Sequence, residues 1–254
     1  MADLRGKTIL LTGASRGIGA ATARTLGEAG ASLAAHYGSH REGAVAAVAA
    51  LPESERLLVQ ADLARPGSAR ELWREAVAWR GRVDVLVVNA ATMPTTPFDG
   101  ADEAWDEGWR QALQVNVLES ASLIREAVRH FLENEGGTVI TLSSWAAQRG
   151  SAISYLGAYA ASKAAIASLT QTVARNYASA GILAYLVAPG IVRTRLSEVS
   201  AAERGGTDAV NAALAMEEMV PPEEVAELIA YLATGSCRHL AGATLDVNGA
   251  SNIR

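Results

Sequence analysis

Two side chains that could exchange protons lie one helical turn apart in this sequence. Tyr159 and Lys163 fall in the alanine-rich stretch 158–166, which is typical of a helix. Positions i and i+4 share one helix face, so the phenol and the ammonium can point into the same space. A tyrosine pKa is normally about 10, and a nearby ammonium lowers it. The residues alone leave two readings open, an acid–base pair or a tyrosine that covers a lysine stem at the surface.

A glycine-rich segment is the second candidate for chemistry. Residues 11–19 read Leu-Thr-Gly-Ala-Ser-Arg-Gly-Ile-Gly and lie between a short apolar run and a helical pattern. Glycines let the backbone turn sharply and approach a pyrophosphate, which the free N–H groups of a helix N-terminus then bind. The spacing is Gly-x-x-x-Gly-x-Gly, and any tight turn between a strand and a helix favours glycine. The segment therefore suggests a nucleotide without establishing one.

Short apolar runs alternate with longer helical patterns along the whole chain. Most runs are apolar at consecutive positions, as expected for strands covered on both faces, and the alternation predicts a parallel sheet with right-handed crossovers. We therefore predict an α/β fold with one domain over residues 1–254. The predicted strands are 8–11, 32–37, 56–60, 83–88, 138–142, 183–187 and 244–247. The predicted helices are 17–29, 41–50, 66–79, 102–131, 155–179 and 222–232.

Segment 196–220 fits this rhythm poorly. It lies between a predicted strand and the helix start at Pro221-Pro222, and it contains Gly205-Gly206. Long insertions in compact domains are often lids over a site. The segment is either a substrate lid or an ordinary helical excursion.

Composition excludes several classes of function. The chain has 254 residues, half of them hydrophobic, with 22 basic and 27 acidic side chains and a formal charge of −5. This balance gives no basic footprint for nucleic acid or an anionic membrane. Cys237 is the only cysteine, which excludes an internal disulfide and fits the cytoplasm. No signal-peptide stretch, spanning segment, metal-ligand histidine spacing or serine nucleophile elbow is evident, so we expect a protein without a metal site or a membrane partner.

The motifs occur in an order that resembles the short-chain dehydrogenase/reductase family over nearly the whole chain. The matching residues are Thr12-Gly13-x-x-x-Gly17-x-Gly19, Asp62, Asn89-Ala90, Asn116, Ser144, Tyr159-x-x-x-Lys163, Pro189-Gly190 and Thr194. The resemblance implies a single Rossmann-type doubly wound domain with about seven parallel strands in the order 3-2-1-4-5-6-7 and helices on both faces. It also implies an enzyme that transfers hydride reversibly between a nicotinamide cofactor and an alcohol/ketone pair.

The resemblance assigns catalytic roles to four residues. Tyr159 would be the acid/base, and Lys163 would lower its pKa and bind the nicotinamide ribose. Ser144 would hold the substrate oxygen, and Asn116 would anchor a water that relays protons to Lys163. Asn116 also has a structural alternative, a polar side chain bonded to backbone.

The cofactor-binding set follows from the same resemblance. Asp62 would contact the adenine or form a turn after its strand, and Asn89 would be a turn residue as well as a cofactor contact. The full set is Gly13, Ser15, Arg16, Gly17, Ile18, Gly19, Tyr37, Arg41, Asp62, Leu63, Asn89, Ala90, Tyr159, Lys163, Pro189, Gly190 and Thr194.

The end of the second predicted strand favours NADP(H) over NAD(H). An acidic residue there would bind the adenosine ribose and select NAD, but the sequence has Tyr37. Arg16 and Arg41 lie nearby, and a guanidinium suits a 2′-phosphate. Alternatively, both arginines are solvated surface charges.

The substrate is less constrained than the cofactor. Pocket candidates are largely apolar, and a small polar acid would need charge from Arg149, Arg193 or Arg195. The alternatives are a 3-oxoacyl-[acyl-carrier-protein] reductase, which the acidic stretch 132–137 disfavours, and a non-catalytic nucleotide sensor or scaffold. The family further implies a homotetramer, or a dimer, through helices 102–131 and 155–179. The pocket candidates are Met93, Trp145, Ala146, Ile153, Tyr155, Ile191 and the segment 196–220.

Overall fold

A central parallel sheet organises the protein. The computed structural model describes residues 2–202 and 205–253, and within them seven strands pair in the order β3-β2-β1-β4-β5-β6-β7. All of the pairings between these strands are parallel, as the sequence predicted. The strands are β1 (Thr8–Leu11), β2 (Ser32–Tyr37), β3 (Arg56–Gln60), β4 (Val85–Val88), β5 (Gly137–Leu142), β6 (Ile182–Pro189) and β7 (Thr244–Val247).

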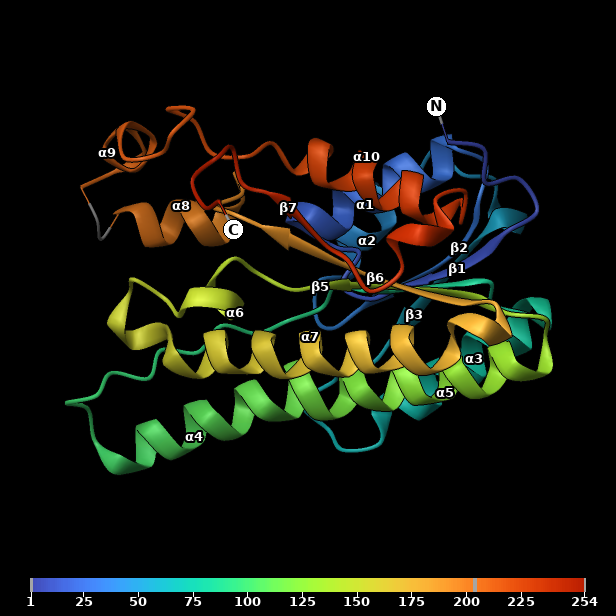
Figure 1. Cartoon of the computed structure of the whole chain (residues 1–254), viewed down its shortest axis with the longest axis horizontal. Coiled ribbons are helices and arrows are strands. Elements are labelled where there is room, and N and C mark those ends of the chain that lie inside the picture. Colours follow the sequence, from blue (N-terminus) through green and yellow to red (C-terminus); the bar gives the residue numbers. More distant parts are fainter. Residues whose placement is uncertain (1, 203–204, 254) are drawn as a thin grey trace.

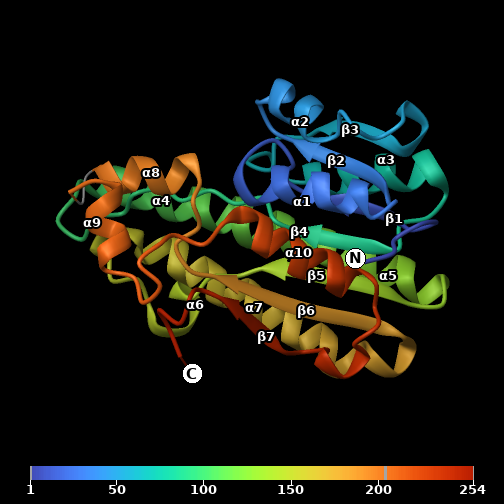
Figure 2. The same cartoon turned by 90° about the horizontal axis from the view of Figure 1, so that it is seen from above.

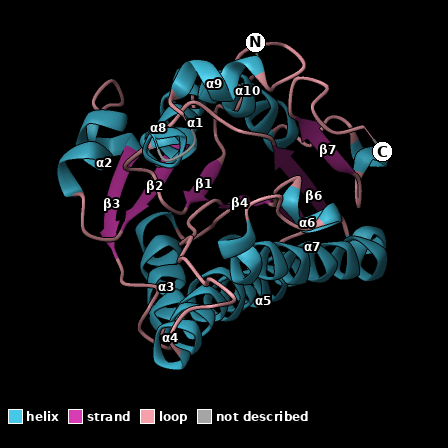
Figure 3. Ribbon diagram, turned by 90° about the vertical axis from the view of Figure 1, so that its left-hand side faces the viewer, coloured by secondary structure: helices cyan, strands magenta, loops and turns pink. Residues whose placement is uncertain are grey.

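Helices cover both faces of the sheet (Figures 1 and 3). One face carries α1 (Gly17–Glu28), α2 (Arg41–Ala47) and α10 (Pro222–Ala233), and the other carries α3 (Ser68–Arg80), α5 (Ser120–Glu133) and α7 (Gly157–Tyr177). Helix α4 (Asp102–Leu113) leads into α5 and extends beyond the sheet. The predicted doubly wound α/β fold is therefore confirmed.

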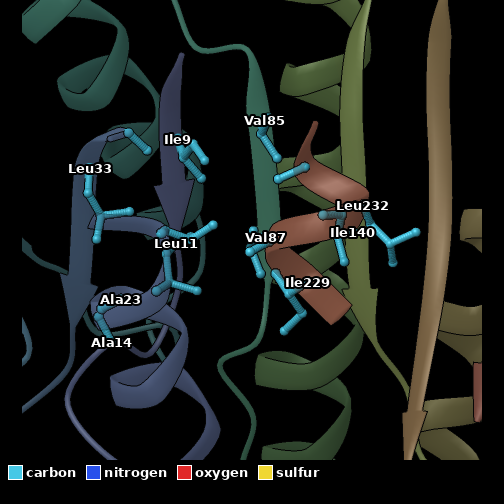
Figure 4. Close-up of a cluster of buried hydrophobic side chains, with 14 of the residues drawn as sticks. Ile9, Leu11, Ala14, Ala23, Leu33, Val85, Val87, Ile140, Ile229 and Leu232 are labelled. Carbon is cyan, nitrogen blue, oxygen red and sulfur yellow. The ribbon is translucent and has the colours of Figure 1, made fainter. Parts of the chain in front are cut away.

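Strand residues alternate between two hydrophobic cores. Ile9, Leu11 and Val87 pack toward α1 and α10, whereas Leu10 and Leu86 pack toward α3 and α5. Figure 4 shows the first core, where side chains of β1, β2, β4 and β5 meet those of α1 and α10. Successive side chains of a strand point to opposite faces, so a strand buried on both sides must be apolar throughout.

The predicted helix 102–131 is interrupted. A turn of π-helix, Gln114–Glu119, separates α4 from α5. Glu119 is buried there and accepts hydrogen bonds from the backbone N–H groups of Gly67 and Ala69, at 2.9 and 2.8 Å. Its carboxylate therefore caps the N-terminus of α3 across the fold, a long-range contact that helical periodicity does not reveal.

Most other elements begin or end within three residues of the predicted positions, and two of these differences have a clear structural context. Strand β4 begins at Val85 rather than at 83, and the carboxylate of Asp84 accepts the N–H of Thr8 at 2.8 Å. Helix α7 begins at Gly157 rather than at 155, after a 3₁₀ turn at Ser154–Leu156.

The connections after the strands gather at one end of the sheet. The carboxyl ends of parallel strands share an edge, which is where ligands bind in doubly wound folds. The short helices α6 (Ala146–Arg149), α8 (Arg195–Ala202) and α9 (Thr207–Ala212) lie at this end, on the left in Figures 1 and 2. They enclose the space beyond β5 and β6.

Candidate active site

The glycine-rich turn after β1 depends on close backbone approach. Gly13 has a φ of +71°, in the left-handed region that favours glycine. A Cβ on Gly19 would lie 1.9 Å from the carbonyl oxygen of Gly13, so a larger residue at position 19 cannot keep this turn. The turn opens α1 at Gly17, where the first N–H groups of the helix have no helical partners. A phosphate group fits such a cradle.

Thr12 and Asn89 join the turn to the end of β4. The Thr12 hydroxyl oxygen accepts the N–H groups of Asn89 and Ala90 at 2.9 and 3.0 Å. The Asn89 amide donates to the carbonyl oxygens of Thr12 and Gly13 at 2.8 and 3.1 Å. Asn89 is therefore a structural turn residue at the switch between β1 and β4, one of the two roles expected for it.

His36 is a member of this site that the sequence analysis missed. It is 2 % exposed, its Nδ1 accepts the N–H of Gly13 at 3.1 Å, and its Nε2 lies 2.9 Å from the carbonyl oxygen of Ala61. These partners require a neutral ring with the proton on Nε2. Burial lowers the pKa of His36, although the hydrogen bond with Ala61 opposes this. The available signal in the sequence was a histidine next to the end of a largely apolar strand, which indicates a buried imidazole with specific hydrogen-bond partners.

The residues expected at the adenosine end lie in the connections after β1, β2 and β3 or, for Tyr37, at the end of β2. Tyr37 is 6 % exposed, whereas Arg16 and Arg41 are exposed. Among the residues that the structure describes, no acidic side chain forms an ion pair with either arginine. Asp62 is exposed and its carboxylate accepts the N–H of Ala64 at 2.9 Å, which is the turn-forming alternative. Leu63 beside it is buried.

Ser144, Tyr159 and Lys163 line one cavity of about 360 Å³ at the carboxyl end of β5. Ser144 and Lys163 are buried, and Ser144 forms a side-chain hydrogen bond with Tyr159. The neighbouring Ser143 instead donates to the backbone carbonyl of Lys163. The structure therefore brings together the predicted serine, tyrosine and lysine, and it distinguishes Ser144 from Ser143.

The electrostatics of the pair differ from the sequence expectation. The Lys163 ammonium lies 5.9 Å from the centre of the Tyr159 ring and donates to the carbonyl oxygen of Leu142 at 2.7 Å. Burial raises the pKa of Tyr159, and the hydrogen bond with Ser144 opposes this rise. Burial also lowers the pKa of Lys163 to about 8. Burial therefore shifts the pKa of Tyr159 in the direction opposite to the lowering expected from the sequence.

Asn116 lies in the π turn and its side chain braces the loop after β4. Its amide oxygen accepts the N–H of Thr92 at 2.8 Å, and its amide nitrogen donates to the Thr92 carbonyl and the Ser162 hydroxyl, both at 2.9 Å. Both donors of the amide are thus occupied. Asn116 is therefore bonded to the backbone, as the structural alternative expected. A water that relays protons would have to bind to an oxygen atom of Asn116, because the amide N–H groups already have partners.

Four more of the predicted cofactor residues reach the same cavity, whereas Ser15 and Ala90 do not line it. Ile18, Pro189, Gly190 and Thr194 line it. Thr194 also packs on the turn, since a Cβ on Gly17 would lie 2.9 Å from its methyl carbon.

The pocket prediction is largely confirmed. Met93, Trp145, Ala146, Ile153 and Ile191 line the cavity. The backbone carbonyl of Tyr155 accepts the N–H of Thr96 at 2.7 Å and so holds the loop that carries Met93.

The segment 196–220 contributes to the cavity wall. It forms α8 and α9, and Ser197, Val210 and Leu214 line the cavity. Residues 203 and 204 of this segment lie outside the described residues.

Residues 2–202 and 205–253 contain no group of three or more His, Cys, Asp or Glu side chains placed to hold a metal ion. No helix in this part of the chain is both long and apolar enough to cross a membrane.

Comparison with known proteins decides the family. The model of a family described as "Enoyl-(Acyl carrier protein) reductase" matches residues 13–251. The chain is 34 % identical to a 3beta-hydroxysteroid dehydrogenase 1 of Eggerthella lenta, over 99 % of this chain and 95 % of the relative. It belongs to the short-chain dehydrogenase/reductase family. This short-chain dehydrogenase/reductase is also 35 % identical to a cis-4-hydroxycyclohexanecarboxylate dehydrogenase of Sinomonas cyclohexanicum, over 96 % of this chain and 95 % of the relative.

Solved structures of the family share the fold and bind either nicotinamide cofactor. A 3-oxoacyl (acyl-carrier-protein) reductase of Agrobacterium tumefaciens with NADP bound superposes with a TM-score of 0.87, at 29 % identity and over 97 % and 95 % of the two chains. A 3-ketoacyl-(acyl-carrier-protein) reductase of Brucella melitensis complexed with NADH gives 0.86, at 25 % identity and over 99 % and 100 %. The protein is therefore an oxidoreductase with an NAD(P)-binding fold that acts on hydroxyl or keto groups.

Proposed function

We propose that this enzyme reversibly reduces an apolar ketone to an alcohol with NADP(H). The observation that carries the proposal is the convergence of Ser144, Tyr159 and Lys163 on one largely apolar cavity. Ile18 of the phosphate-binding turn lines the same cavity, so cofactor and substrate would meet there. When bound, the nicotinamide supplies or accepts the hydride.

The preference for NADP(H) rests on charge at the end of β2. Arg16 and Arg41 are exposed and form no ion pair with a described acid. Tyr37 occupies the place where a carboxylate would repel a 2′-phosphate. Both guanidinium groups would bind that phosphate.

Tyr159 acts as the proton donor in the reducing direction. Its raised pKa keeps the phenol protonated at neutral pH, so the hydroxyl donates its proton to the oxygen of the reduced carbonyl. Ser144 donates a hydrogen bond to that oxygen and holds it beside the phenol. Positive charge on Lys163 stabilises the phenolate that remains after proton transfer. Asn116 holds Thr92 and Ser162, and so fixes the loop and the start of α7 around this centre.

The names of the similar proteins support a cyclic substrate. A 3beta-hydroxysteroid dehydrogenase and a cis-4-hydroxycyclohexanecarboxylate dehydrogenase are each named for an alicyclic alcohol. The apolar wall formed by Met93, Trp145 and Ile153 suits such a ring. Helices α8 and α9 would act as a substrate lid over it.

A carrier-protein reductase is the second candidate, since two similar structures have that name. Glu133 and Glu135 flank the turn before β5, and acidic side chains there would repel an acidic carrier. The third reading, a non-catalytic sensor, requires only that nucleotide binds without turnover.

Two measurements separate these functions. Nicotinamide fluorescence during titration with NADPH or NADH gives the cofactor preference, and NADPH should bind at least 10-fold more tightly. A panel of cyclic ketones and acyl thioesters then gives turnover, with Tyr159→Phe as the inactive control. Turnover of thioesters alone would support the carrier-protein reductase. Binding without turnover of any substrate would contradict the proposed function.

A homotetramer is also proposed for this enzyme. Leu113 and Leu118 are exposed hydrophobic residues on α4 and the π turn, a region through which the family is expected to associate. Light scattering coupled to size-exclusion chromatography measures the assembly directly.

A further inference from the structure

One cation in the cavity wall has no use in the proposed chemistry. Arg149, at the end of α6, lines the cavity, and its guanidinium lies 4.7 Å from the centre of the Trp145 ring. Arg193 and Arg195 were the other arginines considered for substrate charge, and neither is among the described residues that line the cavity.

The charge of Arg149 is not balanced within the described residues. The lining residues include Lys163 as a second cation and no aspartate or glutamate. No described acid forms an ion pair with Arg149. Asp246 accepts a hydrogen bond from Gln148, the residue before Arg149, at 3.4 Å and is not among the lining residues.

Backbone contacts fix the start of α6 beside Ser144. The Ser144 hydroxyl accepts the N–H of Ala146 at 3.2 Å, and the N–H of Trp145 donates to the carbonyl oxygen of Pro189 at 3.2 Å. Arg149 follows Ser144 by five residues, at the other end of this short helix, and both residues line the same cavity. A ring that has its carbonyl at Ser144 therefore has its far side within reach of an arginine side chain.

Apart from Lys163, the other polar side chains of the cavity wall are uncharged. Ser151 accepts the N–H of Ile153 at 3.0 Å, and Thr194 lies 3.3 Å from the Ser197 hydroxyl. Arg149 is exposed, so a ligand charge next to it stays near water while an apolar body enters the cavity. The planar guanidinium matches a carboxylate bidentately, and stacking on Trp145 orients its fork.

We propose that Arg149 selects ketones that carry a carboxylate on the side of an apolar ring opposite the carbonyl. This inference rests on the proposed function and extends it to a substrate class, the alicyclic keto acids. Arg149 is a specificity residue in this scheme, and it takes no part in proton transfer.

A matched pair of substrates tests this selection. 4-Oxocyclohexanecarboxylate and 4-oxocyclohexanecarboxamide have nearly the same shape and differ in charge. The wild-type enzyme with NADPH should prefer the acid about 10-fold in kcat/KM, which is what one partly exposed bidentate pair provides. Arg149→Gln should raise KM for the acid about 10-fold and change KM for the amide less than 2-fold, with kcat unchanged for both. Arg149→Lys should retain part of the preference, and rising salt should reduce it.

Arg193→Gln is the matched control, since it removes the same charge from an exposed position outside the cavity wall. It should keep the preference for the acid. An equal acid-to-amide ratio in the wild type and Arg149→Gln would overturn the inference and leave ketone reduction intact.

A binding experiment separates this inference from the proposed function. Calorimetric titration of the NADPH complex with cyclohexanecarboxylate needs no turnover. Binding that weakens about 10-fold in Arg149→Gln, and is unchanged in Arg193→Gln, supports the carboxylate site even if neither ketone is reduced. Absence of binding to the wild-type complex counts against it.

Discussion

Replacing His36 by leucine should loosen the glycine-rich turn while leaving the catalytic residues in place. The imidazole ring connects three segments, since it accepts the N–H of Gly13 at 3.1 Å and lies 2.9 Å from the carbonyl oxygen of Ala61 at the end of β3. Leucine has a similar volume and no polar atom. His36→Leu therefore leaves two backbone groups without these partners and creates little empty space.

The size of the effect follows from the two lost bonds. An unsatisfied buried backbone group costs about 1–3 kcal/mol. Two such groups give an expected decrease in the free energy of unfolding of about 2–6 kcal/mol for His36→Leu. For a chain of this length that corresponds to a melting temperature lower by about 4–24 °C. Because Gly13 belongs to the turn that we propose binds the cofactor phosphate, the dissociation constant for NADPH should rise about 10-fold, equivalent to about 1.4 kcal/mol.

The pH dependence gives a second, independent readout. Burial lowers the pKa of His36, so the folded protein binds fewer protons there than the unfolded chain. The free energy of unfolding therefore falls as the pH drops below the unfolded histidine value of about 6.5. In His36→Leu this fall should be shallower. The pKa of His130 is also lowered, by burial and by Arg82, and this residue maintains part of the slope.

Differential scanning calorimetry between pH 5 and 8, with and without NADPH, measures all three quantities. His239→Leu is the control, because that histidine is exposed in a 3₁₀ turn far along the chain. If His36→Leu matched the wild type in melting temperature, NADPH affinity and pH slope, the ring would not support the turn and the reasoning would be refuted.

Four other substitutions test the remaining structural arguments. Tyr159→Phe should reduce kcat by about 10²–10⁴; a near-normal rate would exclude the phenol as proton donor. Gly19→Ala should abolish NADPH binding in fluorescence titrations, because its Cβ would lie 1.9 Å from a backbone oxygen; tight binding would show that the turn adapts. Glu119→Gln should lower the free energy of unfolding measured in urea by about 2–3 kcal/mol, because glutamine has one acceptor oxygen and cannot accept the N–H groups of both Gly67 and Ala69. An unchanged urea midpoint would contradict the proposed cap of α3. Burial lowers the pKa of Lys163 from 10.5 to about 8, so the folded protein binds fewer protons than the unfolded chain between these pH values. As the pH rises from about 8 to 10.5, the cofactor-free wild type should therefore gain stability relative to Lys163→Met. A difference in melting temperature that does not change with pH would argue against a buried ammonium.

Local rules account for the features that the sequence determined by itself. Uninterrupted apolar runs alternating with helical patterns predicted the parallel sheet, and its strand order followed from the family resemblance. The four-residue spacing of Tyr159 and Lys163 placed them on one helix face, because helix geometry depends on near neighbours along the chain. The glycine-rich turn was predicted for the same reason, since its backbone conformation is set by the residues within it.

Tertiary structure decided the features that depend on distant segments. Burial sets the direction of the Tyr159 pKa, and the spacing of two residues contains no information about how much water surrounds them. Asn116 pairs with Thr92 and Ser162, and His36 pairs with Gly13 and Ala61, only because folding brings together segments that are far apart in the sequence. Hydrogen bonds and desolvation depend on which groups are close in space. The sequence therefore identified the candidate side chains, whereas the fold determined their hydrogen-bond partners and the direction of their pKa shifts.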